Sequence, residues 1–352
     1  MRSILAGTAA VVGGALLIAG CSSSGSSSSA ASGSSASGGS GAAASAPVTV
    51  RLGYLANITH APALIGVKNG YFAKELGSTG SLKTSVFTSG TQETTAILAG
   101  QIDAAYVGPN PAINAWQKSN GTAIKVVSGV ATGGASVVAQ PGISGPAALK
   151  GKAVATPSLG NTQDVAARFW LKQAGLNTST TGGGDVSIKP TAPNSAAVLQ
   201  FKSGQIAAAS EPAPYDVQLV QEGGKVLLTE PGVTTVLMVT QSFLAAHPDV
   251  VADLLKANVD ALNFIKSSPA QAEQAANAQL GAYTGKPLSA KVLDPAFKEI
   301  TFTADPDSAS LTQDAQQAVQ VGLLKPVNLN GIFDLGPLNT ILKAAGQPAI
   351  SG

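Results

Sequence analysis

The stretch from Lys152 to Lys172 carries residue types suited to holding an anion. An apolar strand and a proline turn are followed by Gly160 and Asn161, and Thr162 and Gln163 then begin a helical pattern. The first N–H groups of a helix have no partner within it, and the helix dipole places partial positive charge there. Nearby hydroxyl and amide groups add donors. The stretch predicts a binding site for a small oxyanion, although an ordinary helix cap has the same sequence.

Two further helix openings could contribute donors to the same ligand. Ser89, Gly90 and Thr91 follow one predicted strand, and Gly108 and Asn110 follow the next. A glycine allows the backbone to approach a ligand closely, and an asparagine amide can donate to it. Asparagine and serine are also common helix caps, so a structural role is the alternative at both places.

The sequence leaves open whether one histidine and one glutamate bind the ligand or have a structural role. His60 follows the first predicted strand, and its protonated imidazole would favour an anion, but a lone histidine is more often structural. A carboxylate facing an anion would repel it. Glu211 in the site would therefore indicate a ligand with an amine, or a pairing with Lys152 or Arg168; it could equally face solvent or cap a helix.

The residues for common catalytic sites are missing from the sequence. There is no phosphate-binding P-loop, no dinucleotide glycine fingerprint, and no credible pair of nucleophile and base. Two histidines and one cysteine cannot build the usual zinc sites. We therefore predict neither an enzyme nor a bound metal or cofactor. Trp116 and Trp170 lie in apolar helical patterns and are predicted to be core residues.

The N-terminal segment has the pattern of a lipoprotein signal. Residues 1–20 are an apolar run ending in small residues, and Cys21, the only cysteine in the chain, follows directly. We predict that residues 1–20 are removed and that Cys21 is lipidated. Residues 21–46 are almost wholly Ser, Gly and Ala, a composition typical of a flexible tether.

The composition of the remaining chain restricts the kinds of partner that it could bind. Charged residues make up 11% of the sequence and the net charge is +2, which gives no electrostatic footprint for nucleic acid. The longest apolar stretches beyond Cys21, such as residues 235–240, have the length of a strand and not of a bilayer span.

An internal repeat of one sequence pattern, called the echo below, indicates two similar lobes. Residues 95–111 and 197–214 each contain a helix end, a Gly-Gln-Ile turn, a short alanine-rich strand and a proline-punctuated loop. Short strands alternate with helices around both, which predicts an α/β fold with mainly parallel sheets. Such sheets bind ligands beyond the carboxyl ends of their strands, so each echo directs a loop towards a ligand.

Several segments together resemble the solute-binding proteins of ABC importers, most closely the branch for aliphatic sulfonates, taurine and nitrate. They are residues 53–64, 70–77, 102–115, 156–166 and 222–227, in this order along the chain. The resemblance implies a periplasmic-binding-protein fold of the second type, with two lobes and two hinge crossovers near residues 134–139 and 233–238. Lobe 1 would comprise residues 47–135 and 234–352, and lobe 2 residues 136–233.

The resemblance also implies a function. The chain would be a monomeric, lipid-anchored protein on the extracytoplasmic face of the cell membrane, binding a small organosulfonate between its lobes and delivering it to an ABC permease with its ATPase subunit. Nitrate and a pyrimidine precursor of thiamine are the alternative ligands. An enzyme of pyrimidine synthesis is disfavoured because the chain lacks a histidine-rich pocket.

Overall fold

The computed structural model describes residues 47–181 and 183–352. Residues 1–46, with the predicted signal peptide, the lipidated Cys21 and the tether, lie outside the described residues. Among the residues described, no helix combines the length and the apolar character needed to cross a bilayer.

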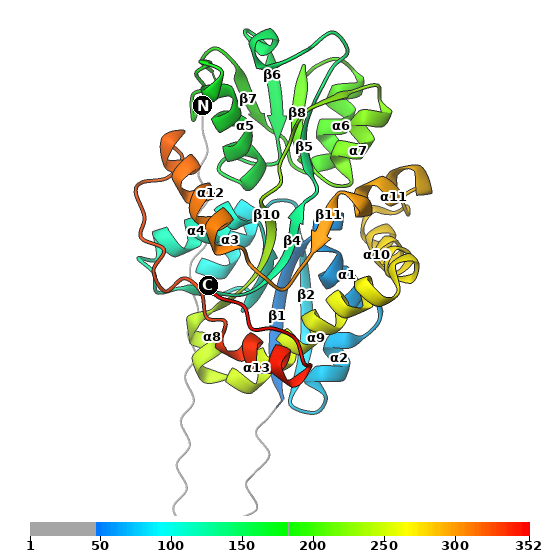
Figure 1. Ribbon diagram of the computed structural model, residues 1–352, viewed down its shortest axis with the longest axis vertical. Helices are drawn as coiled ribbons and strands as arrows, with labels where there is room; N and C mark the ends of the chain where they lie inside the picture. Colours follow the sequence, from blue (N-terminus) through cyan, green and yellow to red (C-terminus); the bar gives the residue numbers. More distant parts are fainter. Residues whose placement is uncertain (1–46, 182) are drawn as a thin grey trace, which may run out of the picture. The chain divides into compact units, whose positions relative to one another are not determined.

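Two mixed sheets form the centre of the two lobes (Figure 1). The sheet of lobe 1 has the order β11-β4-β10-β3-β1-β2 and that of lobe 2 the order β7-β6-β8-β5-β9. The strands of lobe 1 are β1 (Val48–Leu55), β2 (Gly80–Phe87), β3 (Ala104–Val107), β4 (Ile124–Gly133), β10 (Val233–Thr240) and β11 (Ile300–Phe302). Those of lobe 2 are β5 (Ala135–Ala139), β6 (Ala153–Thr156), β7 (Ser187–Pro190), β8 (Ala208–Pro212) and β9 (Lys225–Thr229).

Helices cover both faces of each sheet. Lobe 1 carries η1 (Ile58–His60), α1 (Ala61–Lys68), α2 (Tyr71–Leu76), α3 (Gly90–Leu98), α4 (Pro109–Lys118), α8 (Gln241–Ala246), α9 (Pro248–Ser267), α10 (Pro269–Thr284), α11 (Ala290–Lys298), α12 (Ser308–Gln320) and α13 (Gly336–Ala344). Lobe 2 carries η2 (Pro146–Leu149), α5 (Thr162–Gln173), α6 (Asn194–Lys202) and α7 (Tyr215–Gln221).

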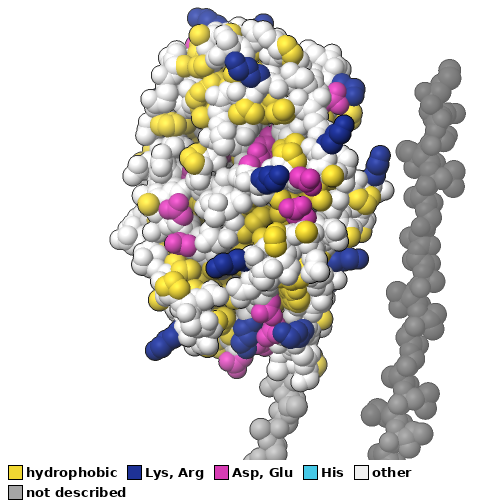
Figure 2. Space-filling view, turned by 45° about the vertical axis from the view of Figure 1, so that its right-hand side comes forward, with side chains coloured by type: hydrophobic (Ala, Val, Ile, Leu, Met, Phe, Trp, Pro, Cys, Tyr) yellow, Lys and Arg dark blue, Asp and Glu magenta, His cyan; other side chains and the backbone are white. Residues whose placement is uncertain are grey.

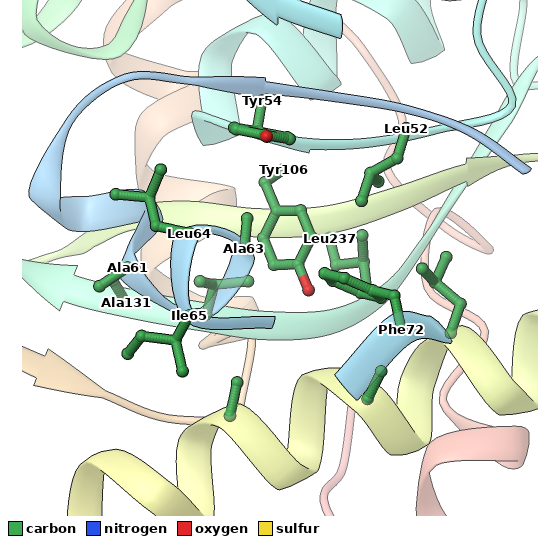
Figure 3. Close-up of a cluster of buried hydrophobic side chains, with 14 of the residues drawn as sticks. Leu52, Tyr54, Ala61, Ala63, Leu64, Ile65, Phe72, Tyr106, Ala131 and Leu237 are labelled. Carbon is green, nitrogen blue, oxygen red and sulfur yellow. The ribbon is translucent and has the colours of Figure 1, made fainter. Parts of the chain in front are cut away.

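The alternation of side chains along each strand explains why both faces are buried. In β3, Ala104 and Tyr106 pack into one apolar cluster, with α1, α2 and α9, whereas Ala105 and Val107 pack into another, with α3 and α4. Figure 3 shows Tyr106 among Ala63, Phe72 and Leu237. Its hydroxyl group donates to Oδ1 of the buried Asn258 at 2.9 Å, so the polar atom inside this core is satisfied.

The echo found in the sequence corresponds to equivalent elements of the two lobes. Helix α3 leads into β3, and α6 leads into β8, and each of these strands lies inside its sheet. The sheets contain fewer parallel pairs than we predicted from the alternation of strands and helices. In the first, β10 runs antiparallel to both of its neighbours, and in the second β5 does. Both strands follow a crossover between lobes, so they enter their new sheet in the opposite direction.

The two crossovers lie next to each other. The chain passes between sheets at Gly133 and Gly134 and again between Thr229 and Val233. The ranges predicted from the sequence fall largely within β5 and β10 instead. Gly133 and Gly134 both have φ of 70°, a conformation that favours glycine, and the N–H of Gly133 donates to the carbonyl of Gly232 at 2.9 Å. The two connections are therefore hydrogen-bonded into one hinge.

The lobes also touch away from the hinge. The Ile58 N–H of lobe 1 donates to the carbonyl of Ala213 in lobe 2 at 2.9 Å. On another side of the interface, Lys172 of α5 donates to the carbonyl of Gln320 in α12 at 2.5 Å. The lobes are thus closed upon each other.

Candidate functional site

A small polar cavity, called the central cavity below, lies where the lobes meet. Its volume is about 20 Å³. It is lined by Leu55, Asn57, Thr59, His60, Ser89, Gly90, Gly108, Pro111, Pro157, Asn161, Thr162, Gln163, Asn194, Pro212 and Thr234. Most of these residues follow the carboxyl ends of β1, β2, β3 and β6, where α/β sheets bind ligands.

Helix α5 brings its first turn to this cavity. Asn161 is the N-cap, and its Oδ1 accepts from the N–H of Asp164 at 3.0 Å, while its Nδ2 donates to Oε1 of Gln163 at 2.9 Å. The side chain of Asn161 therefore holds the turn in place. The N–H groups of Thr162 and Gln163 are the first two of the helix and have no helical partner. Oγ1 of Thr162 is buried without a hydrogen-bond partner.

A buried ion pair fixes the position of this turn. Nε of Arg168 lies 3.0 Å from Oδ1 of Asp164, and both side chains are at most 1% exposed. Asp164 also accepts from the N–H of Gly160 at 2.8 Å and from the hydroxyl group of Thr156 at 3.0 Å. Burial raises the pKa of Asp164, and the charge of Arg168 and these hydrogen bonds oppose that rise. The pair anchors the strand, the turn and the helix to one another.

His60 supplies a neutral imidazole. Its Nδ1 accepts from the N–H of Leu55 at 3.2 Å, so the proton of the neutral ring is on Nε2. Complete burial lowers the pKa of His60 to about 3. The expectation that a protonated imidazole attracts the ligand is therefore wrong for this arrangement: at neutral pH His60 can offer one N–H donor and no charge.

The helix opening at Ser89 and Gly90 faces α5 from lobe 1. Both residues line the central cavity, and Ser89 is the N-cap of α3. Thr91 is not among the lining residues; its hydroxyl group lies 3.2 Å from that of Ser89. Two helix N-termini from different lobes thus open onto one small cavity.

Gly108 allows the lobes to meet. A Cβ atom built on Gly108 would lie 2.6 Å from Oγ1 of Thr162 in the other lobe. With any larger residue at position 108, either the side chain of Thr162 or the two lobes would have to shift. The sequence singled out this glycine for close approach of the backbone to a ligand, and the structure places the hydroxyl group of Thr162 there.

Three other residues singled out in the sequence do not line the central cavity. Nδ2 of Asn110 donates to the carbonyl of Asp314 in α12 at 3.2 Å. Gly160 has φ of 76° and forms the turn before α5. Glu211 is fully buried and accepts from Nδ2 of Asn194 at 2.7 Å.

Glu211 therefore neither faces solvent nor pairs with Lys152 or Arg168. Arg168 is paired with Asp164 instead. Burial raises the pKa of Glu211 well above the usual range, and the nearby acids Asp216 and Glu230 add to this rise. Sequence reasoning missed Asn194, which lines the cavity and holds Glu211 away from it. One feature of the sequence could have indicated Asn194. It begins α6, which corresponds in lobe 2 to α3 of lobe 1, and the opening of α3 was among the predicted sites.

Two larger cavities flank the central one. The first, called the acidic cavity, has a volume of about 560 Å³ and shares Thr162 with the central cavity. The second has a volume of about 630 Å³ and shares Leu55, Asn57 and Asn194 with it. Trp170, predicted to be a core residue, lines the acidic cavity, whereas Trp116 is buried as predicted. The three cavities are separate but share lining residues, and they lie along the interface of the lobes.

Solved structures of small-ligand binding proteins share this fold. The alkanesulfonate-binding protein SsuA from Xanthomonas axonopodis pv. citri, bound to MOPS, superposes with a TM-score of 0.69 over 83% of this chain and 100% of its own, at 18% identity. The periplasmic nitrate-binding protein NrtA from Synechocystis PCC 6803 superposes with a TM-score of 0.73 over 86% of this chain and 90% of its own, at 16% identity. At these identities the likeness establishes the fold.

Sequence comparison extends the likeness to a family. A Brucella abortus protein, named only as a binding protein, is 27% identical over 268 residues, which are 70% of this chain and 79% of that protein. The model of the NMT1-like family matches residues 43–280, most of the chain. The chain therefore belongs to the NMT1-like family.

Proposed function

We propose that the chain is the solute-binding component of an ABC importer that captures a small organosulfonate between its lobes and delivers it to the permease and its ATPase subunit. It acts as a carrier and not as an enzyme. The observation that carries this proposal is the meeting of two helix N-termini, from α3 and α5, at one cavity between closed lobes. Membership of the NMT1-like family and the binding proteins of the same fold support it.

The donors around the central cavity suit an anion that is bound without a counter-charge. The lining residues are uncharged at neutral pH and include the hydroxyl groups of Ser89 and Thr162 and the amide of Gln163. Helix N–H groups bind oxyanions through partial charges and directed hydrogen bonds. The buried Oγ1 of Thr162 lacks a protein partner, as expected of a group that donates to a ligand.

The size of the central cavity implies movement on binding. A cavity needs about 10–15 Å³ to hold a water molecule, so about 20 Å³ is room for one. A sulfonate group has four heavy atoms and requires the lobes to separate around it. Hinge closure about Gly133 and Gly134 is the motion that this architecture provides.

Nitrate is the second candidate ligand. It is planar and has no substituent, so it needs less room than a sulfonate and fits the small volume of the central cavity better. A nitrate carrier would leave the two flanking cavities without a function in binding, and for this reason we place the organosulfonate first.

A binding panel tests the proposal. The protein without its first 46 residues is titrated with alkanesulfonates, taurine, nitrate, sulfate and pyrimidines, and its melting temperature is followed. A ligand at a hundredfold excess over its dissociation constant should stabilise the protein by about 2.7 kcal/mol. Shifts for sulfonates support the proposal, a shift for nitrate alone favours the second candidate, and no shift with any oxyanion overturns both.

The proposed location is the extracytoplasmic face of the cell membrane, where a lipid on Cys21 would anchor the protein. This part of the proposal rests on residues 1–46 of the sequence. Mass spectrometry of the mature protein should find a diacylglyceryl group on an N-terminal Cys21. An unmodified cysteine, or an intact residue 1–20 segment, would contradict the anchor.

A further inference from the structure

The acidic cavity has features that the binding of an oxyanion does not require. It lies between α5, the second crossover and α12, and its volume of about 560 Å³ is within the range of sites for small ligands. Three carboxyl groups line it, from Glu230, Asp307 and Asp314, and no lysine, arginine or histidine does. When they ionise, carboxyl groups in this arrangement repel anions and attract cations.

Glu230 is the central member of this group. Its side chain is 8% exposed, its Oε1 accepts from the hydroxyl group of Ser210 at 3.0 Å, and its Oε2 is buried without a partner. Oδ2 of Asp314 is likewise buried without a partner. Within residues 47–181 and 183–352, none of the three acids takes part in an ion pair. Two buried oxygen atoms at one cavity are thus available to a donor.

Burial and an acidic neighbour both favour the protonated form of Glu230. Burial, together with the charge of Asp216, raises the pKa of Glu230 to about 7, although the hydrogen bond from Ser210 opposes this rise. Burial raises the pKa of Asp314 well above its usual range, with contributions from Glu230 and Asp307. Without a cation, Glu230 is partly protonated near neutral pH; a bound cation would stabilise its carboxylate and displace that proton.

Helix α5 contributes aromatic residues to the lining of the acidic cavity. Phe169 and Trp170 line it together with Thr162 and Ala166, since residues spaced by three and four lie on one face of α5. Aromatic faces attract cations, and they do so more strongly where water is excluded. Thr162 belongs to both cavities, so a ligand held at the opening of α5 can extend along this face towards Glu230.

We propose that the acidic cavity binds a protonated organic amine through Glu230 and Asp314 against Phe169 and Trp170, and that the solute of this carrier is a zwitterion whose oxyanion occupies the central cavity. This inference rests on the proposed function for the oxyanion end. It narrows the ligand class from organosulfonates in general to those that bear an ammonium group.

The test compares ligands with and without the amine. Calorimetric titration uses ω-aminoalkanesulfonates with two to five carbon atoms, alkanesulfonates of the same lengths, and simple alkylamines. We expect at least one aminoalkanesulfonate to bind at least about tenfold more tightly than its amine-free counterpart. Titration in buffers of different ionisation enthalpy at pH 7 should detect proton release on binding of the amine-bearing ligand only.

Substitutions assign the effect to the cavity. Glu230→Gln and, separately, Asp314→Asn keep the shape of the side chain and should remove the preference for the amine; Glu230→Gln should also remove the proton release. Asp249→Asn, an exposed position in the first turn of α9, makes the same charge change away from the cavity and should alter neither.

The outcomes separate the two proposals. Equal affinity for amine-bearing and amine-free sulfonates would overturn this inference and leave the proposed function standing. Binding of alkylamines without any sulfonate would support the cation site and overturn the oxyanion site. A preference for the amine that survives both Glu230→Gln and Asp314→Asn would also overturn this inference, and no binding by any probe would overturn both proposals.

Discussion

At the scale of single residues, Thr162 connects the chemistry of the two cavities. It opens α5, lines both the central and the acidic cavity, and approaches Gly108 of the other lobe. Its hydroxyl group is buried without a protein partner. An unsatisfied buried polar group costs about 1–3 kcal/mol, and this cost is the physical basis for our proposal that the hydroxyl group of Thr162 donates to the ligand.

We expect Thr162→Val to separate binding from stability. Valine has nearly the same shape and lacks the unsatisfied hydroxyl group, so the free energy of unfolding should stay equal or rise by up to about 1 kcal/mol. Affinity for the sulfonate should fall at least about tenfold, or about 1.4 kcal/mol. Urea denaturation and calorimetric titration measure the two effects.

Thr156→Val is the matched control for this substitution. The hydroxyl group of Thr156 donates to Oδ1 of the buried Asp164 at 3.0 Å. Its removal should lower the free energy of unfolding by about 1–3 kcal/mol, because Asp164 loses a donor. Equal losses of stability in both variants would mean that the hydroxyl group of Thr162 has a structural partner.

At the scale of elements, the position of α5 depends on the buried pair of Asp164 and Arg168. Arg168 also donates from Nη1 to the carbonyl of Ser179 at 2.8 Å, which connects the helix to the segment after it. This pair holds the first turn of the helix against the end of β6. The position of the helix opening that lobe 2 contributes to the proposed oxyanion site is therefore set inside lobe 2.

Replacement of Arg168 by Met should be strongly destabilising. It leaves the carboxylate of Asp164 buried without its cation, and breaking a buried pair in this way costs about 3–5 kcal/mol. The double variant Asp164→Asn with Arg168→Met should lose less than the sum of the single losses, because it leaves no buried charge. Additive losses in urea denaturation would show that the two residues act independently.

At the scale of the whole molecule, one of the closest contacts between the lobes is at Gly108. Gly108 has φ of −65° and ψ of 155°, which any residue can adopt, so an alanine there is compatible with lobe 1. Only the approach of Thr162 from lobe 2 would conflict with the new methyl group.

Gly108→Ala should therefore hold the lobes open. We expect a folded protein that binds its solute at least about tenfold more weakly and whose radius of gyration, measured by small-angle X-ray scattering, does not decrease when solute is added. Gly145→Ala is the control, since nothing lies within 4 Å of its added Cβ and its φ is 175°. Compaction of Gly108→Ala equal to that of the unchanged protein would contradict this account of closure.

The buried carboxyl groups should make stability depend on pH. Burial raises the pKa of Glu230 to about 7 and that of Glu299 to about 8, from about 4.3 in an unfolded chain. Between these values the folded state holds protons that the unfolded state has lost, so the free energy of unfolding falls as pH rises. His60, with its pKa lowered to about 3, acts in the opposite direction only below about pH 6.5.

The window from pH 6.5 to pH 8 isolates this effect. Urea denaturation should give a free energy of unfolding that decreases across it, and the decrease should be smaller in Glu230→Gln, which cannot ionise. A free energy that rises across the window would show that these carboxyl groups are ionised in the folded protein.

The low charge of the chain is also visible in the folded molecule. On the face shown in Figure 2, acidic and basic side chains are scattered among uncharged ones, without an extended patch of either sign. This agrees with the composition, in which only 11% of residues are charged. The largest group of acidic residues described above is inside the molecule, where Glu211, Asp216 and Glu230 are buried.

The sequence by itself determined the features that depend on neighbouring residues. Apolar periodicity indicated the α/β fold, the echo between residues 95–111 and 197–214 indicated paired lobes, and a helix was predicted to open at Asn161 or Thr162, where α5 begins. These features are local because caps and periodic faces are set by residues within a few positions of each other.

Only the tertiary structure decided which distant residues meet. Asn110 reaches the carbonyl of Asp314, 204 positions away, and Glu211 accepts from Asn194 and does not line the central cavity. Trp170 lines a cavity because α12 packs beside α5 without covering its aromatic face. Spacing along the chain cannot reveal these contacts, since they depend on how the two crossovers bring the lobes together.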